Sequence, residues 1–103
     1  MVKEYDREVI DFKESILKKY PDAKIIMFGS RARGTNLKSS DFDFVVLSDF
    51  FENKKTPKRL EEVYLFWDSK FNADILPYTF EEFEEQSKLF TIARKAKLEG
   101  IFI

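Results

Sequence analysis

The chain contains neither cysteine nor histidine among its 103 residues. The absence of cysteine excludes a disulfide scaffold, a thiolate metal site and a cysteine nucleophile. The absence of histidine removes the commonest general base and any imidazole ligand for zinc. Any chemistry must therefore use carboxylates, hydroxyls, lysine or arginine. The only cofactor that these side chains are suited to bind is a hard ion with oxygen ligands, such as magnesium.

Long hydrophobic runs and a surplus of one charge are also missing. Apolar runs such as Phe44 to Leu47 are far shorter than the ~20 residues that a membrane-spanning helix needs. No basic and apolar leader opens the chain, so we expect a cytoplasmic protein. The net charge is −1, whereas proteins that hold nucleic acid unaided carry a basic surplus. We therefore expect no membrane association and no tight independent binding of nucleic acid, while a small anionic ligand remains possible.

The residues that are present predict one domain spanning 1–103. The composition, 44% apolar and 36% charged, suits a single globular core. Hydrophobic periodicity and turn residues predict first a helix that ends before Pro21, then strands at 24–28 and 41–47 and a loop at 48–55. A helix capped by Thr56 follows, and its buried face consists of Leu60, Val63, Tyr64, Phe66 and Trp67. The rest of the chain is predicted to form a strand at 73–78, a helix capped by Thr79, a helix near 92–98 and a short strand at 101–103. Pro77 implies an edge or an end of the sheet. This order predicts an α+β fold (an α/β sandwich) with a small mixed β-sheet packed against helices.

The stretch FGSRARGTNLKSSDFDFVVL, residues 28–47, carries an unusual pair of carboxylates. Asp41 and Asp43 alternate in a predicted strand, so they project from the same face with Cα atoms ~6.5–7 Å apart. Phe42 and Phe44 then point into the core. Two carboxylates this close repel each other unless a proton or a cation lies between them. A pair of divalent ions ~3.5–4 Å apart would support in-line phosphoryl displacement.

Asp74 opens the later strand at 73–78 in a similar way. If the strands at 41–47 and 73–78 are neighbours, Asp74 completes the same carboxylate cluster. It would then ligate an ion and help to deprotonate an attacking hydroxyl.

The Gly29-Ser30 turn follows the first predicted strand. Glycine lets the backbone approach a ligand closely, and Ser30 offers a hydroxyl and an N–H group. Residues 30–33 read as one helical turn that ends at Gly34, with its N-terminal N–H groups facing an anion. Each feature alone is more often structural, and Arg31 and Arg33 are more often surface or salt-bridge residues than phosphate ligands.

Better-known signatures do not fit. Gly29 and Gly34 have the glycine spacing of a P-loop, but Thr35-Asn36 occupies the place of its Lys-Ser/Thr. The Asp41-Phe42-Asp43 pair lacks the further ligands and the glycine of an EF-hand loop.

The Gly29-Ser30 turn, ten intervening residues and then Asp41-Phe42-Asp43 resemble the signature of the DNA polymerase beta-like nucleotidyltransferase superfamily. The stretches GSRARG and SDFDFVV are most similar to its small prokaryotic members, the minimal nucleotidyltransferase (MntA-like) antitoxins. The likeness extends over nearly the whole chain, including ADILPY and the closing LEGIFI.

This resemblance implies a nucleotidyltransferase fold and transfer of a nucleoside monophosphate, usually AMP from ATP, to a hydroxyl with two Mg²⁺ ions. By matching positions, Gly29 and Ser30 bind the triphosphate, Asp41 and Asp43 bind both metals, Asp74 is the third carboxylate and activates the acceptor, and Arg33 braces the loop or touches phosphate. It also implies a partner, a HEPN-type RNase toxin whose tyrosine is AMPylated and silenced.

Two other functions stay open. The chain could neutralise a toxin as a binding module by complex formation alone, or hold a sugar nucleotide on a metal, as glycosyltransferases do. Because 103 residues leave no room for an acceptor-binding domain, we expect a separate protein to bring the acceptor or the chain to form a homo- or hetero-oligomer. Phe50, Phe51 and the tail at 101–103 are candidates for contact surface or for core.

Overall fold

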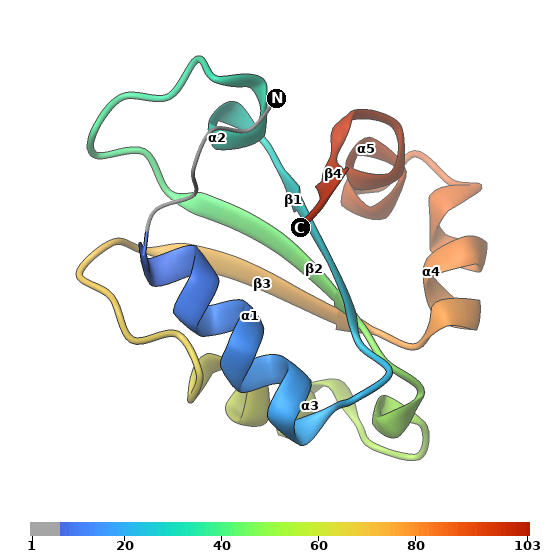
Figure 1. Cartoon of the computed structure of the whole chain (residues 1–103). Helices are drawn as coiled ribbons and strands as arrows, with labels where there is room; N and C mark the ends of the chain where they lie inside the picture. Colours follow the sequence, from blue (N-terminus) through green and yellow to red (C-terminus); the bar gives the residue numbers. More distant parts are fainter. Residues whose placement is uncertain (1–6) are drawn as a thin grey trace.

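The computed structural model describes residues 7–103 and places one mixed β-sheet between two layers of helices (Figure 1). The sequence pattern also predicts Val2 and Tyr5 on the apolar face of the first helix, and these two residues lie outside the described range. The elements are α1 (Arg7–Lys19), β1 (Lys24–Phe28), α2 (Ser30–Arg33), β2 (Phe42–Leu47), the 3₁₀ helix η1 (Asp49–Phe51), α3 (Thr56–Tyr64), β3 (Ala73–Tyr78), α4 (Phe80–Ser87), α5 (Ile92–Glu99) and β4 (Ile101–Phe102). The predicted α+β fold is confirmed.

The sheet has the strand order β3-β2-β1-β4. Strand β1 pairs antiparallel with both β2 and β4, and β2 pairs parallel with β3. The predicted neighbourhood of the strands at 41–47 and 73–78 is therefore confirmed. Pro77 lies in the edge strand β3, where its missing N–H costs no ladder hydrogen bond.

One face of the sheet packs against α1 and α3 through large aromatic side chains. Phe42 and Phe44 of β2 are buried there, as predicted, with ring centroids 5.9 Å apart. Phe12 of α1 lies 4.9 Å from the ring of Phe44, and Trp67 lies 5.2 Å from that of Phe42. This aromatic layer packs against one face of β2. Because side chains alternate along a strand, the residues between Phe42 and Phe44 and beyond must point to the opposite face of the sheet.

The opposite face packs against α4 and α5. Its core consists of smaller side chains, namely Ile26, Phe28, Val45, Leu47, Phe83, Ala93 and Ala96. Asp43 shares the parity of Val45 and Leu47, and Asp74 shares that of Leu76 and Tyr78, which pack against this core. The two aspartates therefore extend the α4/α5 face beyond the end of its hydrophobic core.

Most predicted boundaries agree with the structure to within a residue or two. The strand expected at 41–47 begins at Phe42, and the helical turn at residues 30–33 ends at Gly34, which is left-handed with φ +78°. Thr79 caps α4 through a full capping box with Glu82. The predicted cap at Thr56 is wrong, because Lys55 is the N-cap of α3 and makes no side-chain cap hydrogen bond.

The buried face predicted for the third helix is only partly correct. Val63 is buried, but Tyr64 is 39% exposed and α3 ends there, so Phe66 and Trp67 pack against the core from the following turn. The loop predicted at 48–55 contains the 3₁₀ helix η1. Phe51 of η1 is fully buried and belongs to the core, whereas Phe50 and, in the tail, Phe102 are exposed and available as contact surface.

Candidate active site

The predicted carboxylates lie at the end of the sheet where β2 and β3 begin and β1 finishes. Asp43 and Asp74 are register partners in the parallel pair β2–β3, so they project from the same face as neighbours. Asp41 immediately precedes β2 and is exposed. The topology thus brings together residues that are 31 positions apart in the chain.

Gly29 lies directly against Asp43. Phe28 is the register partner of Asp43 in the antiparallel pair β1–β2, and Gly29 follows with φ +80°, a conformation that L-residues rarely adopt. A Cβ atom built on Gly29 would overlap Oδ2 of Asp43. Glycine is therefore required at this turn for two independent reasons, and the backbone lies beside the carboxylate as the sequence predicts.

The local electrostatics confirm that Asp43 has acidic neighbours. Its pKa is raised, first by burial, then by repulsion from Asp74 and from Asp41. Lys95 of α5 and Arg33 of α2 oppose this shift by attraction. From residues 7–103, none of the three aspartates accepts a side-chain hydrogen bond or makes an ion pair. The acidic neighbours and burial outweigh the attractions of Lys95 and Arg33, so the cluster stays acidic, which suits an external cation.

The two arginines of the motif have different environments. The guanidinium of Arg31 stacks over the ring of Phe42 at 4.0 Å and donates hydrogen bonds to the carbonyl oxygen of Ser40. Arg31 therefore braces the loop that leads into β2. Arg33 lies 3.5 Å from Glu99 in an exposed ion pair that costs little to break, so it remains available to an anion.

The donor set fits a hard divalent ion, although the ligands are not gathered around one point. Within the described residues, no three acidic side chains are arranged so that they could hold a metal ion as they stand. The chemistry nevertheless suits magnesium, because carboxylate oxygens are its preferred protein ligands. The carboxylate of Asp43 fills the space that a Cβ on Gly29 would take, so this ligand lies directly against the glycine backbone.

Lys95 is a site residue that sequence reasoning missed. It lies on the exposed side of α5, whose buried residues are Ala93 and Ala96. Its positive charge attracts Asp43 and opposes the rise in the pKa of that carboxyl group. No local signal could have identified it, because a solvent-facing lysine in a helix is ordinary and only the packing of α5 against β1 brings it near the site.

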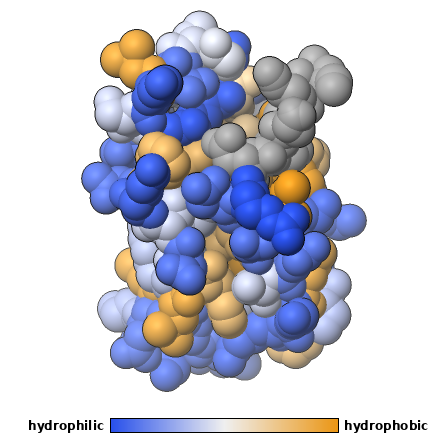
Figure 2. Space-filling view, turned by 60° about the vertical axis from the view of Figure 1, so that its left-hand side comes forward, coloured by the Kyte–Doolittle hydropathy of each residue, from blue (hydrophilic) through white to orange (hydrophobic). Residues whose placement is uncertain are grey.

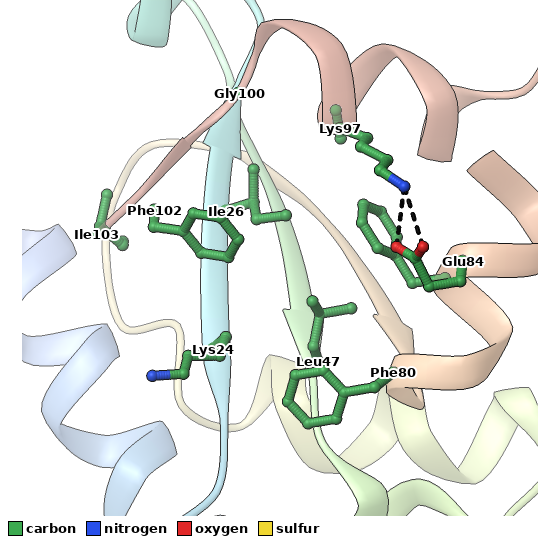
Figure 3. A pocket seen from close by; sticks show the side chains of 11 residues that line it. Lys24, Ile26, Leu47, Phe80, Glu84, Lys97, Gly100, Phe102 and Ile103 are labelled. Carbon is green, nitrogen blue, oxygen red and sulfur yellow. Dashed lines mark hydrogen bonds and ion pairs between the residues drawn. The ribbon is translucent and has the colours of Figure 1, made fainter.

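A separate hollow lies on the α4/α5 face, away from the aspartates. Its volume is about 680 Å³, and its walls come from β1, β4, α4 and α5 (Figure 3). Phe80, Phe83 and Phe102 give it an apolar lining, and Lys97 pairs with Glu84 at its rim. None of the predicted site residues lines this hollow.

Figure 2 shows the face of the molecule that lies on the left in Figure 1. This face is mostly hydrophilic, with scattered hydrophobic residues. Within residues 7–103, no helix has both the length and the hydrophobicity needed to cross a membrane.

Comparisons with known proteins identify the family of the chain and a similar fold. A comparison with curated proteins gives no match. Among solved structures, the fold resembles a candidate nucleotidyltransferase from Sulfolobus solfataricus, with a TM-score of 0.59 at 16% identity over 99% of this chain and 90% of that one. The model of the nucleotidyltransferase domain family matches residues 9–99. This match covers the glycine turn and all three aspartates, and the chain therefore belongs to the nucleotidyltransferase domain family.

Proposed function

We propose that this chain is a magnesium-dependent nucleotidyltransferase that transfers AMP from ATP to a hydroxyl group of a partner protein. The observation that carries the proposal is the in-register pairing of Asp43 with Asp74 directly beside Gly29. Among the described residues these carboxylates accept no side-chain hydrogen bond and make no ion pair, and the negative charges of Asp74 and Asp41 repel that of Asp43. A site for a cation and an anionic substrate explains why the fold retains them.

The residues divide the reaction between them. Gly29 and Ser30 hold the triphosphate, and Arg33 and Lys95 supply positive charge near it. Asp74 accepts the proton of the acceptor hydroxyl, whose oxygen forms a bond to the α-phosphorus. The bond between the α-phosphorus and the oxygen bridging to the β-phosphorus breaks, and pyrophosphate leaves with that electron pair.

The carboxylates of this site are of the type that Mg²⁺ prefers, and we propose that they hold two ions. Asp41 and Asp43 would hold both ions, and Asp74 would complete the ligand set. Bound there, the ions supply charge stabilisation for the attacking and leaving oxygens. The protein contributes the alignment, because β2 and β3 fix the backbones of Asp43 and Asp74 side by side.

The acceptor we propose is a tyrosine of a HEPN-type toxin, which makes this chain an MntA-like antitoxin. The motif resemblance supports this choice, and so does the near-neutral net charge of −1, which disfavours a nucleic-acid acceptor.

The test is to incubate the chain with Mg²⁺, ATP labelled at the α-phosphate and a HEPN-type toxin. We expect label on a toxin tyrosine, release of pyrophosphate, and loss of both when that tyrosine is changed to phenylalanine. ATP labelled at the γ-phosphate is the control and should leave the toxin unlabelled. Pyrophosphate release without label on protein would contradict a protein acceptor, and no pyrophosphate release with any hydroxyl acceptor would contradict the transferase.

A binding module that neutralises a toxin without chemistry is the second candidate. It is favoured by the turn between α4 and α5, which presents Leu89, Ile92 and a 96% exposed Phe90 to solvent. Exposed apolar residues gathered in this way commonly mark protein contacts. A stable complex that inhibits the toxin equally well without ATP, and that fails when Phe90 is replaced by serine, would support this candidate over the enzyme.

A further inference from the structure

The hydroxyl group of Tyr64 bridges the two residues that flank Asp74. It donates a hydrogen bond of 3.1 Å to the carbonyl oxygen of Ala73, and it accepts one of 2.9 Å from the backbone N–H of Ile75. One side-chain atom from the end of α3 thus holds the backbone immediately before and immediately after the proposed third carboxylate.

The other side of this backbone is held by β2. Phe42 donates its N–H to the carbonyl of Asn72, and Ser48 donates its N–H to the carbonyl of Tyr78. Because backbone groups alternate along a strand, the even-numbered residues of β3, including Asp74, turn their N–H and C=O groups toward β2. The odd-numbered residues turn theirs toward the open edge, where Tyr64 binds them. The chain around Asp74 is therefore held from both edges.

Tyr64 is itself anchored to the part of the core that supports Asp43. Its carbonyl oxygen accepts a hydrogen bond from the N–H of Trp67. The Trp67 indole packs against Phe42 and Phe44, which flank Asp43 in β2. The same aromatic layer thus supports the strand that carries Asp43 and anchors Tyr64, which bridges the residues on either side of Asp74.

We propose that Tyr64 is a positioning residue that fixes Asp74 beside Asp43 and so sets the geometry of the acidic site. This inference rests on the proposed function. Asp74 begins an edge strand at its exposed end, where strands fray most readily, and without the hydroxyl only one side of its backbone would be held. The carboxylate of Asp74 would then sample positions away from its partner, at a cost to any ion that both must hold.

Covering a strand edge is the simpler role for such a residue. Arg59 plays that role farther along β3, where it donates to the carbonyl of Pro77, remote from the aspartates. A tyrosine that only covered the edge would affect stability, as we expect of Arg59, and would leave ion binding unchanged. Ion binding therefore separates the two roles.

The experiment measures Mn²⁺ binding by electron paramagnetic resonance, in the presence of a non-hydrolysable ATP analogue. Tyr64→Phe keeps the ring and removes only the hydroxyl, and we expect it to weaken Mn²⁺ binding about 10-fold. Tyr78→Phe is the matched control, because it removes a hydroxyl from the far end of the same strand, and its affinity should equal that of the wild type. In an Asp74→Asn background, Tyr64→Phe should cause no further weakening, since both changes act through one carboxylate.

The inference would be overturned if Tyr64→Phe bound Mn²⁺ as tightly as the wild type. It would also be overturned if Tyr64→Phe weakened Mn²⁺ binding equally in the wild-type and Asp74→Asn backgrounds. Amide hydrogen exchange at Ile75, measured by NMR, provides a readout that needs no ion. We expect at least 10-fold faster exchange in Tyr64→Phe than in the wild type or in Tyr78→Phe. If the wild type bound no Mn²⁺, the proposed function would fail. Unchanged exchange at Ile75 would then overturn the positioning role as well, and accelerated exchange would support it.

Discussion

The two ends of strand β2 carry carboxylates with opposite environments. At the far end, Asp22 accepts hydrogen bonds from the Ser48 hydroxyl at 2.7 Å and the Asp49 N–H at 2.8 Å. Beyond it, Glu82 accepts two hydrogen bonds from Arg59, at 2.6 and 3.0 Å. At the starting end, Asp41 and Asp43 accept no side-chain hydrogen bond from the described residues.

The pKa shifts of Glu82, Glu62 and Asp43 follow the same division. Hydrogen bonds from Arg59 lower the pKa of Glu82, and a hydrogen bond from Tyr20 lowers that of Glu62. Burial and acidic neighbours raise the pKa of Asp43. The far end uses its carboxylates to stabilise the fold, whereas the starting end holds them ready for a ligand from outside. Substitutions at the two ends should therefore have opposite consequences for stability and activity.

The largest effect is expected at the starting end, from Asp74→Asn. This change keeps the size of the side chain and removes the group proposed to accept the proton, so the rate of AMP transfer should fall about 10² to 10⁴-fold. Binding of a non-hydrolysable ATP analogue, measured by calorimetry, should be largely retained. Asp68→Asn, in the exposed loop after α3, is the control. Transfer at the wild-type rate by Asp74→Asn would remove this residue from the mechanism.

The next largest effect is expected at the far end, from Arg59→Ala. Arg59 is buried and also donates a 2.8 Å hydrogen bond to the carbonyl of Lys54. Its loss should lower the free energy of unfolding by about 2–4 kcal/mol, measured in urea, because several charged hydrogen bonds disappear together. Mn²⁺ affinity should not change. Arg7→Ala, which removes an exposed pair with Asp11, should cost less than about 0.5 kcal/mol.

A pair of glycine substitutions probes the contact between the turn and the carboxylate. Gly29 and Gly34 have φ values of +80° and +78°, so alanine is strained at both. The strain is larger at Gly29, because its ψ of −162° lies in a region essentially confined to glycine, whereas Gly34 is in the left-handed region. Only at Gly29 would the new Cβ overlap Asp43, whereas Gly34 faces open space. We expect Gly29→Ala to weaken Mn²⁺ binding about 10-fold and Gly34→Ala to leave it unchanged. Equal affinities would show that Gly29 is only a turn residue.

The smallest effects, each below about 1 kcal/mol, concern the pH dependence of stability. The lowered pKa of Glu82 stabilises the fold above its unfolded value of 4.5, and this contribution is lost as the pH falls through the folded pKa. The raised pKa of Asp43 destabilises the fold at neutral pH, and the penalty is relieved as the pH falls toward 3.8. In thermal unfolding at pH 7, Glu82→Gln should lower Tm and Asp43→Asn should raise it. Both differences should vanish in strong acid, and shifts of equal sign at pH 7 would contradict the division between the two ends.

The sequence was sufficient to predict those parts of the site that depend on alternation within a strand. The run from Phe42 to Leu47 specifies which face Asp43 takes, and the strand that contains Asp74 is short and apolar enough to be recognised. Which strands lie side by side depends on tertiary packing. The sequence analysis therefore had to assume that these two strands are neighbours in order to place Asp74 beside Asp43. The structure confirms this assumption.

The features that the sequence could not predict all arise from packing between distant elements. The approach of Lys95 to Asp43 depends on how α5 lies over β1. Tyr64 was assigned to the buried face of its helix, but its hydroxyl reaches the edge of β3. Lys55, not Thr56, is the N-cap of α3, because the helix already begins at Thr56. Threonine is the better capping residue, so the sequence pattern predicted the start one residue too late.

Ligand-dependent thermal unfolding of the wild type and of the double variant Asp41→Asn/Asp43→Asn tests the central claim most directly. Without ligand, the double variant should be at least as stable as the wild type, because burial and acidic neighbours outweigh the attraction of Lys95 and Arg33 for Asp43. With Mn²⁺ and a non-hydrolysable ATP analogue at about 100 times Kd, the wild type should gain about 2.7 kcal/mol of stability and the double variant none. An equal gain by both proteins would contradict the account, since the ligand would then bind without the carboxylates at the start of β2.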